Sequence, residues 1–218
     1  MGFAVLLAGG DDPSRELLSG VGEAQLVVAA DGAVRIARAQ GLPIHAVVGD
    51  LDSVAAGDVA WAQAEGAEIV EFPADKDLTD LELAMAHAEQ TPGIDRIVVL
   101  AVEGGRLDHE MGNWAVCCRC WEVPVDVHTN RASIAILHGS GRNEVEIDGK
   151  PGDIVSLIAR GGSAKGVEAS GLRWPLTDAV LEPDSSLGIS NEFIDPVAKV
   201  SVDEGVLLVV RPGVSPIN

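Results

Sequence analysis

Continuous apolar runs alternate with helical patterns over the first 128 residues, and this alternation constrains the fold more than any other feature. The apolar runs fall at residues 3–8, 25–30, 44–48, 68–72, 96–102 and 123–127. Helical patterns lie near residues 14–18, 33–40, 54–65, 80–89 and from 107 onward. Strands that are apolar throughout are typical of a parallel sheet covered on both faces. The pattern predicts a doubly wound, mostly parallel α/β domain over residues 1–128.

The character of the chain changes near residue 130, where helical periodicity ends. Glycine-rich turns then separate short apolar runs at residues 133–137, 144–147, 154–158, 164–168, 197–202 and 206–210. Short strands at this spacing indicate an antiparallel sandwich or barrel. We therefore expect a β-sandwich domain over residues 129–218, which gives an α/β + β fold class.

Charge and hydropathy exclude several classes of protein. The 218 residues include 34 acidic and 15 basic side chains, a formal net charge of -19. Such a surface repels phosphate backbones, so nucleic acid is not an expected partner. No segment reaches the roughly 18 consecutive apolar residues of a membrane span, and the N-terminal stretch lacks the basic start of a signal peptide. We expect no membrane association and, by default, a cytoplasmic location.

Three cysteines lie together as Cys117, Cys118 and Cys120. Their spacing lacks the C-x-x-C pair of a zinc site. We expect reduced thiols packed along a helix, which also suits a reducing compartment.

The loop after the third apolar run presents two carboxylates, Asp50 and Asp52. Ligands of doubly wound sheets bind outside the carboxyl ends of the strands. If the backbone is extended, side chains two residues apart point the same way. Magnesium takes one or two carboxylates and completes its shell with waters and phosphate oxygens. A turn with an aspartate cap before the next helix explains the pair as well, so both interpretations stay open.

The loop after the fourth apolar run has a good structural explanation for part of its sequence. Thr79 as N-cap and Glu82 three residues later match a capping box, and Asp80 is favourable near the positive end of a helix. Capping leaves Lys76 and Asp77 unexplained. Lys76 could pair with a phosphate or neutralise its acidic neighbours.

The loop after the fifth apolar run combines glycines with charged residues. Gly104 and Gly105 would let backbone amides approach a ligand closely, and the planar guanidinium of Arg106 suits phosphate. An ordinary glycine-rich turn, with Asp108 in the first helical turn, explains the segment as well. His109 could be a ligand, a base or a surface residue. Because the sequence has no P-loop, no G-x-G-x-x-G and no nucleophile elbow, a bound nucleotide must be held by carboxylate-bound metal and loop amides.

In their order and spacing, residues 49–53, 76–82 and 104–109 resemble motifs of the thiamine pyrophosphokinase family. Residues 171–176 and 190–192 are similar to the thiamine-side motifs of that family. Residues 30–33 read Ala-Asp-Gly-Ala where the family has Ala-Asp-Gly-Gly. The methyl group of Ala33 could narrow the room for a ligand near Asp31.

The resemblance implies a magnesium-dependent thiamine diphosphokinase, which transfers diphosphate from ATP to the hydroxyl of thiamine and releases AMP. It also implies a homodimer with the site at the subunit interface, ATP and magnesium in residues 1–128, and thiamine in residues 129–218. The catalytic residues would be Asp50, Asp52, Asp80 and Asp108, the first three also binding the metal. ATP and its phosphates would be bound by Asp31, Lys76, Asp77, Thr79, Gly105 and Arg106. Thiamine would be bound by Trp174, Ser190 and Asn191.

Physical chemistry is consistent with this assignment, and alternatives remain. The thiazolium of thiamine is cationic, and an indole face such as that of Trp174 can stabilise a cation; Trp174 could instead be part of a β core. A 6-hydroxymethylpterin diphosphokinase on a similar fold is one alternative, which the thiamine-side motifs disfavour. A non-catalytic nucleotide or thiamine sensor is another, which the complete set of carboxylates disfavours.

Overall fold

The computed structural model describes residues 2–213 and 217 and divides the chain into two compact units. The first unit holds the residues up to Arg119 together with Val127–Asn130, and the second holds Cys120–Asp126 and Arg131–Gly213. Residue 128, the predicted domain boundary, lies in the segment where the chain passes between the units. The assignment of one substrate to each domain stays a prediction. No helix within residues 2–213 is long and apolar enough to cross a membrane.

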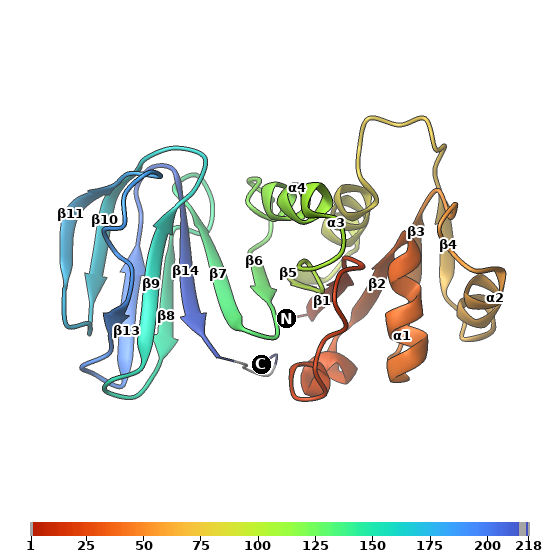
Figure 1. The fold of residues 1–218 in the computed structure, drawn as a ribbon, viewed down its shortest axis with the longest axis horizontal. Coiled ribbons are helices and arrows are strands. Elements are labelled where there is room, and N and C mark those ends of the chain that lie inside the picture. The colour runs from red at the N-terminus through yellow and green to blue at the C-terminus, as the bar shows by residue number, and fades with distance from the viewer. Residues whose placement is uncertain (1, 214–216, 218) are drawn as a thin grey trace. The chain divides into compact units, whose positions relative to one another are not determined.

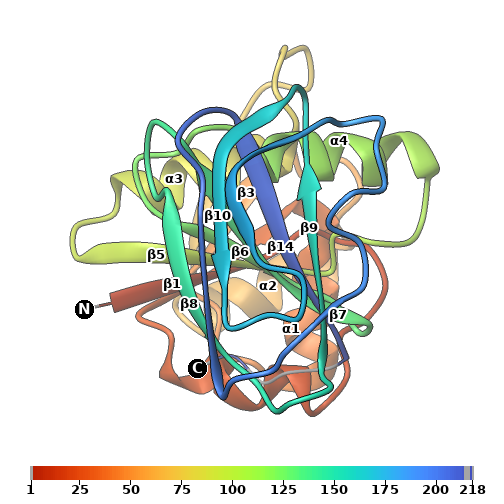
Figure 2. The same cartoon turned by 90° about the vertical axis from the view of Figure 1, so that its left-hand side faces the viewer.

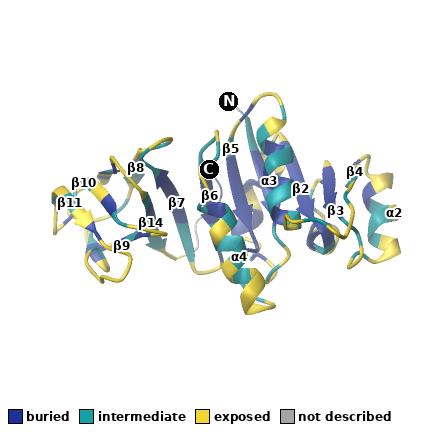
Figure 3. Cartoon of the chain, turned by 90° about the horizontal axis from the view of Figure 1, so that it is seen from above, coloured by how far each residue is buried: buried dark blue, intermediate teal, exposed yellow. Residues whose placement is uncertain are grey.

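The first unit is built on a parallel sheet with strand order β5-β1-β2-β3-β4 (Figure 1). Its strands are β1 (Gly2–Leu7), β2 (Leu26–Ala30), β3 (Ala46–Gly49), β4 (Glu68–Glu71) and β5 (Ile94–Leu100), and β6 (Val125–His128) is divided between the units. The central strand β2 is buried along its whole length, as Figure 3 shows in dark blue, and β1 is buried from Ala4 to Leu7. The predicted parallel sheet is thereby confirmed.

Helices cover both faces of this sheet. They are α1 (Val34–Gln40), α2 (Ala56–Ala64), α3 (Asp80–Gln90) and α4 (Leu107–Cys117), with the 3-10 helices η1 (Leu17–Glu23) and η2 (Asp31–Ala33). Val5 and Leu7 share a core with residues of α1. Leu6 is equally buried but points to the opposite face, because strand side chains alternate. That second face is covered by α3, which packs on β1, β2, β3 and β5.

Three local expectations need correction. The helix expected near residues 14–18 is the 3-10 helix η1, shifted to Leu17–Glu23, where two glycines disfavour an α-helix. Of the three cysteines, Cys117 alone packs buried at the end of α4, whereas Cys118 follows as the C-cap and Cys120 is exposed; all three are free thiols. A buried core position for Trp174 is wrong, because the side chain is 51% exposed.

The second unit consists of two antiparallel sheets, whose strands Figure 2 shows running alongside one another. One sheet has the order β12 (Asn191–Glu192), β9 (Ile154–Ala159), β14 (Val206–Pro212) and β7 (Ala132–His138). The other has the order β11 (Leu176–Leu181), β10 (Ala164–Ser170), β13 (Val197–Ser201) and β8 (Glu144–Asp148). Side chains of both sheets, among them Leu157 and Val200, share one buried core. The predicted antiparallel β-sandwich is confirmed.

Candidate active site at the carboxyl edge of the parallel sheet

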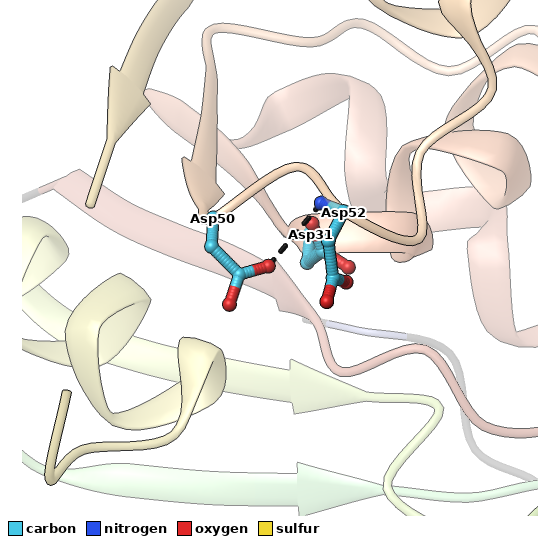
Figure 4. A group of neighbouring side chains, drawn as sticks. All are labelled: Asp31, Asp50 and Asp52. Carbon is cyan, nitrogen blue, oxygen red and sulfur yellow. Dashed lines mark hydrogen bonds between the residues drawn. The ribbon is translucent and has the colours of Figure 1, made fainter. Parts of the chain in front are cut away.

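Three carboxylates from two strand ends meet at the carboxyl edge of the parallel sheet (Figure 4). Asp31 follows β2, and Asp50 and Asp52 follow β3, which lies beside β2. One oxygen of each carboxylate lies within 4.8 Å of the others. The Asp52 backbone N–H donates to Asp50 Oδ1 at 3.2 Å, and Leu51 between them has a φ of +61°. The segment is therefore a turn, and its carboxylates nevertheless converge.

Asp31 is the most buried member of this group. Asp31 is 7% exposed. Its backbone has a φ of +46°, a left-handed conformation that aspartate adopts more readily than most residues. Ser53 Oγ donates a hydrogen bond to Asp31 Oδ2. Asp31 is not the cap of α1, because the N-cap position of that helix is Ala33, which makes no side-chain hydrogen bond. Oδ1 is buried and has no hydrogen-bond partner among the described residues.

Gly49, the last residue of β3, allows the carboxylates to approach one another. A Cβ atom at this position would lie 2.8 Å from the Cβ of Asp31 and 3.1 Å from Asp80 Oδ1. Any larger side chain would therefore push Asp31 and Asp80 apart. The glycine before the Asp50 turn is required by this close packing.

Lys76, in the loop that precedes α3, and Asp80, the first residue of α3, join the group. Lys76 Nζ donates to Asp50 Oδ2 at 2.7 Å and lies 3.1 Å from Asp80 Oδ1. Thr79 caps α3, because its Oγ1 accepts from the Glu82 backbone N–H at 3.3 Å. The reciprocal half of the predicted capping box is wrong: Glu82 Oε1 pairs with Arg119 at 2.6 Å.

The charges of the group perturb one another. The hydrogen bond from Lys76 lowers the pKa of Asp50. The pKa of Asp52 is raised, chiefly by the negative charge of Asp50, with smaller contributions from Asp31 and Asp80. The site is strongly negative and would gain from a bound cation.

A cavity of about 690 Å³ opens beside these carboxylates. Predicted site residues in its wall are Asp31, Asp52, Thr79, Asp80, Arg106 and Asp108. The wall also contains Ala8, Gly9, Ala30, Gly32, Ala33, Arg35, Ser53, Leu81, His109, Gly112 and Asn113. Ala33, whose methyl group was expected to narrow the site, therefore lies in the cavity wall. Asp50, Lys76, Asp77 and Gly105 are not among the lining residues.

Arg106 and Asp108 form an ion pair at the start of α4. The guanidinium donates to both carboxylate oxygens, Nε at 3.1 Å and Nη2 at 2.6 Å. This pairing lowers the pKa of Asp108 to about 2, so the carboxylate is ionised at neutral pH. Both side chains are mostly exposed, which leaves the guanidinium accessible to an anion in the cavity.

Sequence reasoning missed Arg35 and Ser53 as residues of this site. Arg35 lines the cavity, although no motif marks an arginine in the first turn of a short helix. Ser53 was part of a motif, but its bond to Asp31 depends on the pairing of β2 with β3. The same pairing brings Asp31 to the Asp50 turn, where Asp80 also lies.

The donor set fits a hard divalent cation. Magnesium prefers oxygen ligands at about 2.0–2.1 Å, so two of its ligands lie at most about 4.2 Å apart. The oxygens of Asp31, Asp50 and Asp52, within 4.8 Å of one another, need only small side-chain rotations to reach one ion. The unpartnered Oδ1 of Asp31 is an acceptor that such an ion would satisfy.

The predicted thiamine-side residues lie together in the second unit. Asn191 is 4% exposed, and its amide holds the backbone of Trp174: Oδ1 accepts from Trp174 N at 3.1 Å and Nδ2 donates to Trp174 O at 2.7 Å. The guanidinium of Arg173 lies 5.1 Å from the centroid of the Trp174 ring. Ser190 is exposed, with its backbone N–H bound to Ser156 Oγ. Thiamine contact by these residues stays a prediction.

Comparison with family models and known proteins agrees with this arrangement. Residues 19–129 match the model of the thiamin pyrophosphokinase catalytic domain, and residues 142–207 match that of the thiamin pyrophosphokinase vitamin B1 binding domain. Thiamine pyrophosphokinase of Bacillus subtilis is 27% identical over 182 residues, which cover 83% of each protein. Thiamine pyrophosphokinase 1 of Oryza sativa is 28% identical over 167 residues; the match covers 74% of this chain but only 63% of the rice protein.

Solved structures show the same architecture. The crystal structure of thiamine pyrophosphokinase from Bacillus subtilis superposes with a TM-score of 0.79 at 24% identity and covers 98% of this chain and 99% of that one. The protein from Geobacillus thermodenitrificans gives a TM-score of 0.75 at 27% identity, with 98% of each chain covered. Since the catalytic-domain model alone matches about half of the 218 residues, the chain belongs to the thiamin pyrophosphokinase family.

Proposed function

We propose that the protein is a thiamine diphosphokinase, which transfers diphosphate from ATP to the hydroxyl of thiamine and forms thiamine diphosphate and AMP. The observation that carries the proposal is the cavity of about 690 Å³ whose wall combines Asp31, Asp52 and Asp80 with Arg106. A nucleotide triphosphate bound with magnesium needs both charges: carboxylates for the metal and a guanidinium for the phosphates.

The protein supplies position and charge to this reaction. Diphosphoryl transfer depends on alignment of the reactants and neutralisation of developing charge more than on covalent catalysis. Arg106, oriented by Asp108, binds phosphate oxygens, and Thr79 lies beside it in the cavity wall. Phosphate contact by Asp77 and by the backbone at Gly105, which lie outside that wall, rests on the family resemblance alone. Asp50, Asp52 and Asp80 are the proposed metal ligands, and the oxygens of Asp31, Asp50 and Asp52 within 4.8 Å of one another support including Asp31.

A magnesium ion held by these carboxylates would supply the positive charge that the transferred diphosphate and the leaving AMP require. The chain holds its carboxylates for this purpose at the ends of adjacent strands, where rigid elements fix them. Asp80 stands at the first position of α3, whose positive end favours the ionised carboxylate.

Thiamine binding is assigned to Trp174, Ser190 and Asn191. The exposed indole already has the guanidinium of Arg173 5.1 Å from its centroid, which supports the idea that this ring accepts a cation. The side-chain amide of Asn191 fixes the backbone of Trp174 through two hydrogen bonds. The proposal includes a homodimer with the site at the subunit interface, on family resemblance, and a cytoplasmic location, which the free thiols favour.

Release of AMP tests the proposal. Purified protein is incubated with ATP and magnesium chloride, and AMP and thiamine diphosphate are quantified by chromatography with and without thiamine. The two products should form in equal amounts and only with thiamine. AMP release with 6-hydroxymethylpterin alone would assign the enzyme to that acceptor. Binding of nucleotide and thiamine without turnover would indicate a sensor.

Two matched variants show whether the turnover belongs to this site. Asp80→Asn removes one negative charge from the cavity wall and should lower the rate at least about a hundredfold, because metal-dependent charge stabilisation supplies several kcal/mol. Asp58→Asn removes the same charge from α2, where Asp58 pairs with Arg38 outside the cavity. Its rate should stay near that of the unmodified protein.

A further inference from the structure

Lys76 lies where two structural elements of the site meet. Its Nζ donates to Oδ2 of Asp50, the residue that directly follows β3, at 2.7 Å. The same Nζ lies 3.1 Å from Oδ1 of Asp80, the first residue of α3. The side chain of Lys76 is 14% exposed, as is that of Asp50. One ammonium group therefore connects the end of a strand with the start of a helix.

The surrounding charges give this connection its importance. Asp31, Asp50 and Asp52 have carboxylate oxygens within 4.8 Å of one another. Asp80 lies close to this group, because a Cβ atom added at Gly49 would contact both Asp31 and Asp80. Four carboxylates this close repel one another, and water screens Asp31, which is buried, less than it screens the exposed Asp52. The pKa of Asp52 is raised by this repulsion. Without a compensating cation, the Asp50 turn and the start of α3 would tend to separate.

We propose that Lys76 is a positioning residue that acts as an internal counter-ion, holding Asp50 and Asp80 in place for the metal, and that it does not bind phosphate. Two observations favour this role over phosphate binding. The side chain is not part of the cavity wall, and its ammonium already has carboxylate oxygens as partners.

This inference rests on the proposed magnesium site, but its consequences are measured without substrate. In EDTA, Lys76→Met leaves the carboxylates without their counter-ion, so the melting temperature should fall by about 5 °C. Added magnesium should then stabilise the Lys76→Met protein more than the unmodified protein, because the metal replaces the missing charge. Lys76→Arg keeps the charge and should recover at least half of the loss.

The control is Lys165→Met. Lys165 pairs with Glu204 at the similar distance of 2.8 Å, but both side chains are more than half exposed. The melting temperature of this variant should stay within about 1 °C of the unmodified protein, as expected for an exposed ion pair. Equal effects of Lys76→Met and Lys165→Met in EDTA would overturn the proposal.

Nucleotide binding separates the two roles of Lys76. At saturating magnesium, titration of Lys76→Met with a non-hydrolysable ATP analogue should give a dissociation constant within about threefold of the unmodified protein. A rise of tenfold or more, with an unchanged melting temperature in EDTA, would make Lys76 a phosphate ligand and refute the positioning role. Because thiamine and turnover are absent from these measurements, their outcome is independent of whether the acceptor is thiamine.

Discussion

Arg35 brings a second guanidinium to the cavity that contains Arg106. It extends from α1, and its two terminal nitrogens bind Asp12 Oδ1 at 2.6 Å and the carbonyl oxygen of Gly10 at 3.0 Å. A guanidinium has five N–H groups, so donors remain for a ligand. The same contacts hold the glycine-rich segment after β1 against α1. Arg35 therefore has the position and the free donors of a nucleotide-binding residue.

Alanine substitution of Arg35 should weaken binding of a non-hydrolysable ATP analogue about tenfold, since a charge-assisted hydrogen bond contributes roughly 1.5–3 kcal/mol. Arg38 on the same helix is the matched control: it pairs with Asp58 at 2.6 Å and has a similarly exposed side chain, but it lies outside the cavity wall. Isothermal titration of Arg35→Ala and Arg38→Ala measures both. Equal affinities would show that Arg35 only secures the segment after β1.

Among the elements, α3 contributes most to the geometry of the site. Its first turn contains Asp80, its N-cap is Thr79, and its buried face packs on the parallel sheet. The Thr79 hydroxyl satisfies the Glu82 N–H, which would otherwise lack a partner in the helix. The position of the Asp80 carboxylate thus depends on a cap that also lines the cavity.

Thr79→Ala should lower the free energy of unfolding by about 1 kcal/mol, the usual cost of losing a helix N-cap. Thr79→Ser keeps the hydroxyl and should retain nearly all of the stability. Urea denaturation followed by circular dichroism measures the difference. If Thr79→Ala is as stable as Thr79→Ser, the cap is not what holds the start of α3. A specific rise in the KM for ATP would then leave phosphate binding as the main role of Thr79.

The elements differ in how far their sequences determine them. β1 and β2 could be predicted because they are apolar along their whole length, and β5 because it is apolar from Ile97 to Leu100. α1 could be predicted because Gly41 ends it in a left-handed conformation. β11 was missed, because this edge strand, half of whose residues are exposed, shows no clear apolar run. Asp31 was placed on the correct sheet edge but not in the carboxylate group. That placement depends on which strands are neighbours, and the order along the chain does not determine it.

At the scale of the whole molecule, the family matches follow the two kinds of architecture. The catalytic-domain model covers the parallel-sheet region from β2 onward, and the vitamin B1 binding model covers most of the β-sandwich. The carboxylates and the cavity of about 690 Å³ belong to the first unit, whereas Trp174 belongs to the second. If each unit binds its own substrate, a change confined to the second unit should alter the affinity for thiamine and leave the affinity for nucleotide unchanged.

Substitution of Trp174 tests this division. The indole is 51% exposed, so truncation removes little buried area and should leave the fold intact. Trp174→Ala should raise the dissociation constant of thiamine about tenfold, because a desolvated cation–π contact contributes up to about 2 kcal/mol. Trp174→Phe should lose less, since it keeps an aromatic face. Titrations with thiamine and with the ATP analogue measure both affinities.

Leu187→Ala is the control for Trp174→Ala, because Leu187 is an apolar side chain of the same unit with 56% exposure. Its affinity for thiamine should match that of the unmodified protein. The affinity of Trp174→Ala for nucleotide should stay within about twofold, because neither Trp174 nor its neighbours line the cavity. A larger loss of nucleotide than of thiamine binding would mean that the two substrates are not divided between the units as proposed, and Trp174 would then have to be assigned to the phosphate side of the reaction.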